Sequence, residues 1–159
     1  MERKVMDGEA HIGIIGRKPS SQFQSMKLGV LKSRVYVGEE HPLHSYAKSK
    51  KEIKIEEVLQ YEFAGFLEPL VFEVNILNTS TDGWRDDKLP RKIALKADSI
   101  ETVLRTVEAG IYMSYLPDAI AKHREMLPLK IIGCPYTCET EVFLLSKKDM
   151  EFGWMKNLF

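Results

Sequence analysis

Short apolar runs alternate with segments of helical periodicity along most of the chain. Strands are expected at 12–15, 27–37, 63–67, 93–95, 111–116, 130–133 and 141–146. Helices are expected near 3–7, 55–61, 69–76, 100–109, 117–126 and 152–159, and residues 39–54 are expected to form a loop. Strands that alternate with helices are typical of parallel βαβ units, so the pattern predicts an α/β fold.

The helix expected at 100–109 carries signals at both of its ends. Asp98 as an acceptor with Glu101 three residues on forms a capping box, and Gly110 is a natural C-terminal stop. The apolar face of this helix and its neighbouring strands should share one core. Its expected members are Val103, Leu104, Val107, Ile111, Met113 and Phe63.

Composition excludes several classes of protein. Hydrophobic residues make up 44% and charged residues 29% of the 159 residues, as in a globular protein. Lys plus Arg and Asp plus Glu number 23 each, so the chain lacks the basic excess of a dedicated nucleic-acid binder. No apolar run approaches the roughly 18–20 residues of a membrane span, and no signal peptide is visible. We therefore expect a cytoplasmic protein without a membrane partner.

Residue types that bind metals do not form a convincing site. Cys134 and Cys138 are four apart, but a zinc site needs more ligands at short spacing, so they are interpreted as reduced thiols beside a turn. His41 and His44 flank Pro42, which disfavours a helix there, so a solvated loop is expected. No Gly-x-Ser-x-Gly elbow or Gly-rich phosphate loop occurs. No cofactor, metal or catalytic residue is predicted.

Three junctions at the ends of expected strands are the better candidates for a binding site. They are Ile15-Gly16-Arg17, Leu67-Glu68 and Asp98-Ser99. In parallel α/β sheets, ligands bind beyond the carboxyl ends of strands, where helix N-termini offer N–H groups to anions. Asp98 and Ser99 are also explained by a plain helix cap.

The order of motifs resembles the effector-binding domain of LysR-type transcriptional regulators over nearly the whole chain. The matching segments are Asp7-Gly8-Glu9 with Ile12-Gly13-Ile14, Val35-Tyr36-Val37 with His41-Pro42-Leu43, residues 55–59, residues 99–110 with Leu116-Pro117, and residues 141–147. The chain departs from the family pattern at His11 and Tyr112. The winged helix-turn-helix head and the first strand-helix-strand of the first lobe are not found.

The resemblance implies a type 2 periplasmic-binding-protein-like α/β fold with two lobes joined by two crossover strands. Lobe I, incomplete, would comprise 1–36 and 139–159, and lobe II would comprise 37–138. The strand at 12–15 and the strand at 111–116 should then lie in separate sheets. The unpaired edge of the former predicts a homodimer.

The implied function is the sensing of a small-molecule effector in the cleft between the lobes, without enzymatic activity. Carried over, the effector-binding positions are Ile15, Gly16, Arg17, Leu67, Glu68, Asp98 and Ser99, with Arg17 as a counter-charge. DNA would be bound only through a separate head domain. One alternative is a prephenate-dehydratase-like enzyme, whose Thr-Arg-Phe motif is not found. The other is a solute-binding component of a transporter, which needs a signal peptide or lipoprotein cysteine.

Overall fold

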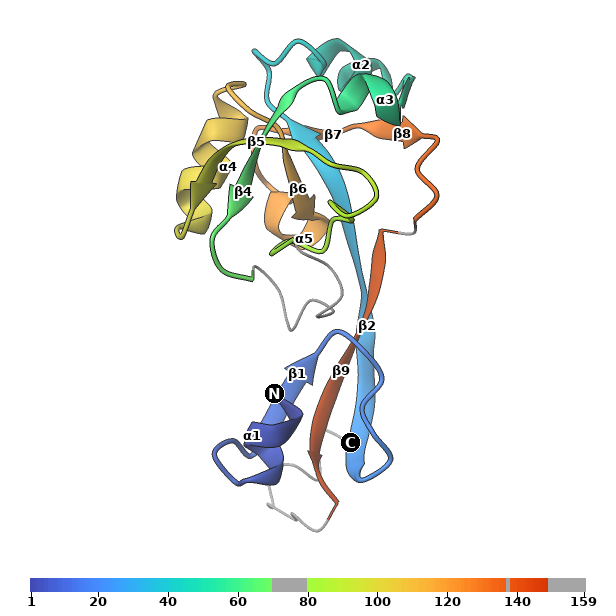
Figure 1. Ribbon diagram of the computed structural model, residues 1–159, viewed down its shortest axis with the longest axis vertical. Coiled ribbons are helices and arrows are strands. Elements are labelled where there is room, and N and C mark those ends of the chain that lie inside the picture. Colours follow the sequence, from blue (N-terminus) through green and yellow to red (C-terminus); the bar gives the residue numbers. More distant parts are fainter. Residues whose placement is uncertain (70–79, 137, 149–159) are drawn as a thin grey trace. The chain divides into compact units, whose positions relative to one another are not determined.

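The structure is a computed structural model, and it describes residues 1–69, 80–136 and 138–148 (Figure 1). Residues 70–76 of the helix expected at 69–76, and the helix expected at 152–159, lie outside the described residues. The chain divides into two compact units. The first consists of 1–31 and 139–159, and the second of 32–138.

The first unit is built on two antiparallel strands and one short helix. Helix α1 (Glu2–Met6) precedes strand β1 (Ile12–Ile15), which pairs with β9 (Glu139–Lys147). The antiparallel register places Ile12 opposite Ser146 and Ile15 opposite Phe143. A small core holds these elements together. Its buried members are Val5, Ile15, Phe23, Phe143 and Leu145.

Strand β2 (Phe23–Val37) is 15 residues long and belongs to both units. Hydrogen-bonded strand pairs run in the order β1-β9-β2-β6, where β6 is Ser114–Pro117. The expectation that residues 12–15 and the strand ending at Pro117 lie in separate sheets is therefore wrong. Because β2 neighbours β9 and also pairs with β6 over Ser33–Tyr36, it makes the strand path continuous.

The second unit contains the parallel pairs that the alternation of strands and helices predicted. Strand β4 (Glu62–Phe66) runs parallel to β5 (Lys92–Ala97), and β3 (Glu52–Lys54) runs parallel to β8 (Lys130–Ile132). Strands β6 and β7 (Leu127–Pro128) pair antiparallel with β2.

Two expected segments of the second unit differ in the structure. Residues 39–54 are not all loop, because helix α2 (His44–Ser49) and strand β3 form there. Pro42 lies just before α2 and not inside it, so the helix tolerates it. Helix α3 (Ile55–Val58) and helix α5 (Asp118–Ala121) are shorter than expected. After α5 the backbone turns extended at Lys122, so the helix does not reach residue 126.

In the described part of the second unit, buried apolar side chains form two clusters. One contains Val103, Leu104 and Val107 of helix α4 (Ile100–Glu108), and the other contains Phe63 and Met113. The expectation of a single shared core is wrong, since successive residues of a strand face opposite sides. Phe63 and Ala64 of β4 illustrate this, because they belong to different clusters.

Ile111 is 61% exposed, so its predicted burial is wrong as well. Strand β6 begins only at Ser114, and Ile111 lies in the turn that follows Gly110. The glycine has a φ of +69°, a conformation that ends α4 as the sequence predicted.

Truncation of Leu104 tests the core that α4 forms. The side chain is 2% exposed, and a Leu104→Ala substitution is expected to lower the free energy of unfolding by about 2–5 kcal/mol, because it leaves a cavity. Urea unfolding followed by circular dichroism measures this loss. A cost near zero would show that the face of α4 does not pack as described.

Candidate functional site

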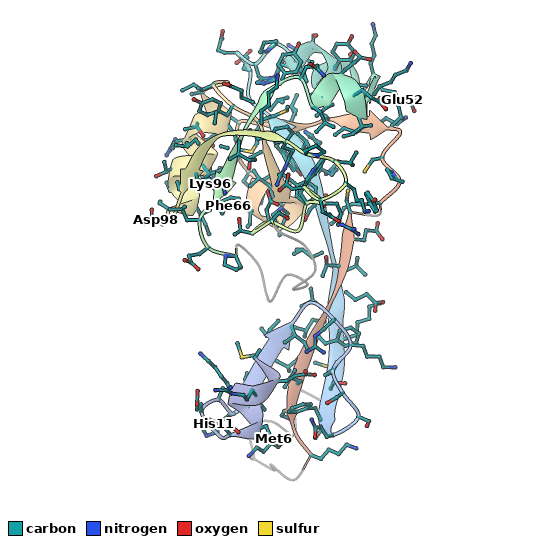
Figure 2. All side chains as sticks on the ribbon, in the orientation of Figure 1. Met6, His11, Glu52, Phe66, Lys96 and Asp98 are labelled. Carbon is teal, nitrogen blue, oxygen red and sulfur yellow. The ribbon has the colours of Figure 1, made fainter. Side chains whose placement is uncertain are left out.

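The carboxyl ends of β4 and β5 form one edge of the second unit. Phe66 pairs with Ala97 in parallel register, and the N–H of Leu67 donates to the carbonyl of Ala97 at 3.0 Å. Figure 2 shows Phe66 and Asp98 at the same end of this strand pair. Parallel pairing therefore brings together Leu67-Glu68 and Asp98-Ser99, which are about thirty residues apart in sequence.

Helix α4 begins at this edge, and Ser99 is its N-cap. The Ser99 hydroxyl oxygen accepts the N–H of Thr102 at 3.4 Å. The predicted capping box from Asp98 to Glu101 is wrong by one residue, because the helix starts at Ile100. Glu101 instead binds Arg105 at 2.9 Å and Arg124 at 2.6 Å. Its pKa is lowered first by the hydrogen bond from Arg124.

The edge is accessible and has both polar and apolar character. Glu68, Asp98 and Ser99 are exposed, Leu67 is 55% exposed, and Ile100 is 43% exposed. The first-turn N–H groups of a helix lack intrahelical partners and carry partial positive charge. These features suit a small molecule that has an acidic group, hydroxyl groups and some apolar surface.

The three predicted positions of the first unit differ in accessibility. Ile15 is 2% exposed and belongs to the core, so it offers almost no accessible surface to a ligand. Gly16 is half-buried and Arg17 is exposed. Arg17 pairs with Glu2, whose carboxylate also accepts the N–H of Ser20 at 3.0 Å. Burial on its own would raise the pKa of Glu2, but these hydrogen bonds outweigh burial and lower the pKa.

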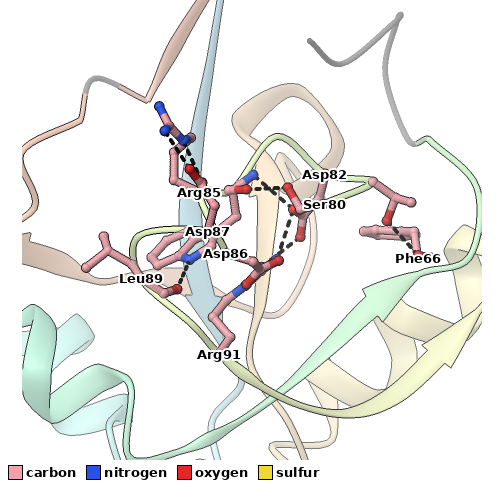
Figure 3. A network of polar contacts seen from close by, with 10 residues as sticks. Phe66, Ser80, Asp82, Arg85, Asp86, Asp87, Leu89 and Arg91 are labelled. Atoms are coloured by element: carbon pink, nitrogen blue, oxygen red, sulfur yellow. Dashed lines mark hydrogen bonds and ion pairs between the residues drawn. The ribbon is translucent and has the colours of Figure 1, made fainter. Parts of the chain in front are cut away.

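A buried ionic cluster in the second unit was missed by the sequence analysis (Figure 3). Arg91 lies 2.8 Å from a carboxylate oxygen of Asp82 and 2.8 Å from one of Asp86. The side chains of Arg91 and Asp82 are each 2% exposed. Burial opposes the charge on Arg91, but its hydrogen bonds with both carboxylates raise its pKa. Because the guanidinium and both carboxylates bind one another, we assign the cluster a structural role.

Aromatic rings complete the surroundings of this cluster. The Arg91 guanidinium lies 5.0 Å from the ring centroid of Trp84 and 5.3 Å from that of Phe63. The Trp84 indole N–H donates to the carbonyl of Leu89 at 2.8 Å. The segment from residue 80 to 91 is thus fixed against the core, although its polar sequence gave no signal beyond a loop.

The histidines are not solvated as predicted. His41 is 5% exposed, its Nδ1 accepts the N–H of Leu43 at 3.1 Å, and its ring lies 5.5 Å from that of Tyr61. Burial lowers the pKa of His41. The His44 ring contacts the carbonyl of Gly38 at 3.0 Å. Within the described residues, no three His, Cys, Asp or Glu side chains gather to hold a metal ion.

In α/β domains, small molecules bind beyond the carboxyl ends of parallel strands, where helices begin. A family model described as LysR substrate binding domain matches residues 1–151. The chain therefore belongs to the LysR substrate-binding domain family, the effector-sensing domains of LysR-type transcription regulators. This confirms the resemblance stated above. Domains of this family are regulatory.

Solved structures of the family share this fold. The regulatory domain of CcmR from Synechocystis PCC6803 in complex with 2-PG matches with a TM-score of 0.69 at 13% identity, over 99% of this chain and 74% of that chain. The effector binding domain of QuiR in complex with shikimate matches with a TM-score of 0.62 at 17% identity, over 95% and 68%. The predicted type 2 periplasmic-binding-protein-like α/β fold is confirmed.

Full-length BenM matches with a TM-score of 0.66 at 19% identity, over 98% of this chain. The chain spans 50% of the length of that regulator. No curated protein sequence matches the chain. In the described part of the structure, none of the helices has the length and apolar character needed to cross a membrane.

Proposed function

We propose that the chain senses a small hydroxylated carboxylate or phosphate, bound at the edge formed by Leu67, Glu68, Asp98 and Ser99. The observation that carries this proposal is the parallel register of β4 and β5, which sets Leu67 beside the Ser99-capped start of α4. The acidic group of the effector would accept N–H groups from the first turn of α4. Glu68 and Asp98 are acceptors that suit its hydroxyl groups.

Two structural neighbours support this class of effector, because one is in complex with shikimate and the other with 2-PG. Ile15, Gly16 and Arg17 remain predicted effector contacts of lobe I. Arg17 would exchange the Glu2 carboxylate for that of the effector.

Effector binding would act by shifting a conformational population. A ligand changes such an equilibrium only by binding one arrangement better than another. We propose lobe I as 1–36 with 139–159 and lobe II as 37–138, with DNA bound through a separate head domain. The protein would be cytoplasmic, non-enzymatic and dimeric. Within the described residues β1 pairs with β9 alone, so the other side of this strand offers backbone N–H and C=O groups to a strand of a second copy.

A pair of isosteric substitutions at Ser99 tests the proposed site. Ser99→Asp and Ser99→Asn both keep a good helix cap, but only the aspartate adds a negative charge beside the bound anion. We expect the asparagine variant to keep effector affinity within about threefold, and the aspartate variant to lose at least about tenfold, or about 1.4 kcal/mol.

The measurement begins with a thermal-shift screen of shikimate, 2-PG and related hydroxy acids, because a ligand of the folded state raises the melting temperature. Calorimetry of the best compound then compares the wild type with the two variants. Equal affinities for the aspartate and asparagine variants would place the effector elsewhere.

A further inference from the structure

The only two cysteines of the chain line the same cavity in the second unit. The cavity has a volume of about 40 Å³, and Trp84, Tyr115 and Tyr136 also line it. A water molecule needs roughly 10–15 Å³ on this measure, so a molecule as small as hydrogen peroxide fits. These two thiols belong neither to the proposed effector site at the ends of β4 and β5 nor to the Arg91 cluster.

Both cysteines are reduced and half-buried, and each has a defined setting. The Cys134 thiol contacts the carbonyl of Tyr136 at 3.8 Å, just after the turn at Gly133, whose φ is +80°. The carbonyl of Cys138 accepts the N–H of Ser33 at 2.9 Å, which holds its backbone against β2. Both cysteines therefore line one cavity, Cys134 from a turn and Cys138 from a position that is anchored to β2.

Tyr115 gives the cavity a neutral hydroxyl group. Burial is the main cause that raises the pKa of the Tyr115 phenol, and its hydrogen bond with Cys138 raises this pKa further. The phenol thus stays protonated at neutral pH and lies beside the Cys138 thiol. Such a group can protonate or orient a leaving oxygen.

We propose that Cys134 and Cys138 form an oxidisable dithiol, a modification site at which a hydroperoxide produces an intramolecular disulfide. This inference goes beyond effector sensing and is independent of it. A thiolate is the nucleophile in this chemistry, and a neighbouring cysteine resolves the first oxidation product.

The reaction balances with hydrogen peroxide as the only co-reactant. One thiolate attacks a peroxide oxygen, so that an S–O bond forms, the O–O bond breaks, and the departing hydroxide becomes water. The second thiolate attacks the sulfenic sulfur, so that the S–S bond forms, the S–O bond breaks, and a second water leaves. Two sulfurs lose two electrons in total, and one peroxide becomes two waters.

The test treats the purified, reduced chain with a small excess of hydrogen peroxide. We expect alkylation and peptide mapping to show an intrachain link between Cys134 and Cys138, with both thiols lost together and recovered by dithiothreitol. In a Trp154→Phe background, fluorescence from Trp84 should change on oxidation and return on reduction, because Trp84 lines the cavity.

Single variants and an unfolded control separate the alternatives. Cys134→Ser and Cys138→Ser should each stop at a sulfenic acid, which a 1,3-dione reagent traps. The same oxidation in concentrated urea should be slower if the fold presents the two thiols to each other. Interchain disulfides, unreacted thiols, sulfinic acid in the wild type, or equal rates in urea would each overturn the proposal.

Discussion

An Arg91→Met substitution is expected to lower the free energy of unfolding by about 3–5 kcal/mol. Methionine retains much of the apolar contact with Trp84 and Phe63 but removes both ion pairs. The carboxylate of Asp82, which is 2% exposed, then loses the guanidinium that compensates its burial. Removing one partner of a buried pair costs far more than the net value of the pair, because a buried charge remains.

The neighbouring pair of Arg85 and Asp87 is the matched control. Its hydrogen bonds are 2.7 Å long, but its side chains are 33% and 29% exposed, so water can solvate either partner alone. Arg85→Met should therefore change stability much less than Arg91→Met, as is usual for surface ion pairs. Urea unfolding of the two variants measures the difference. Similar losses would mean that the Arg91 cluster is not effectively buried.

Much of the secondary structure could be predicted because local pattern decides it. Val35, Tyr36 and Val37 are β-branched or aromatic, and they end the long strand β2. The face of α4 and its stop at Gly110 also follow from spacing and from the conformational freedom of glycine. Each of these signals lies within a few residues of the element that it specifies.

The segment 39–54 shows why other elements could not be predicted. Helix α2 has only six residues, too few to be stable by propensity alone. It is stabilised by the burial of Ala47, next to Leu43, in a core that also contains Val35 and Met113. These partners come from distant strands, and the sequence pattern does not report them.

The sequence predicted the individual residues of the candidate site, but not which of them lie side by side. The sequence indicated that Leu67 and Asp98 follow strands, whereas their adjacency depends on which strands pair. The convergence of Asp82 and Asp86 on Arg91 depends on the path of a loop with no periodicity. Likewise, the spacing of Cys134 and Cys138 does not reveal that they line a cavity together with Trp84 and Tyr115.

A Gly38→Ala substitution is expected to destabilise the second unit by more than about 4 kcal/mol. Gly38 follows β2 directly, and an added Cβ would meet the carbonyl oxygen of Val107 and, at 2.5 Å, that of Glu108. Overpacking usually costs about 1–3 kcal/mol, because flexible side chains move aside. Here the opposing atoms are backbone carbonyls at the end of α4, which cannot move independently of the helix.

The end of α4 is fixed on both sides, so relaxation at Gly38 is costly. Val107 is fully buried, and Gly110 lies so close to the backbone of His41 that it too leaves no room for a Cβ. Gly65→Ala is the control: the added Cβ would meet side-chain atoms of Ile93 at 3.6 and 3.8 Å, which are ordinary contacts. Both substitutions reduce the entropy of the unfolded chain similarly, so their difference in urea unfolding isolates the clash. Two equally stable variants would show that α4 shifts readily away from Gly38.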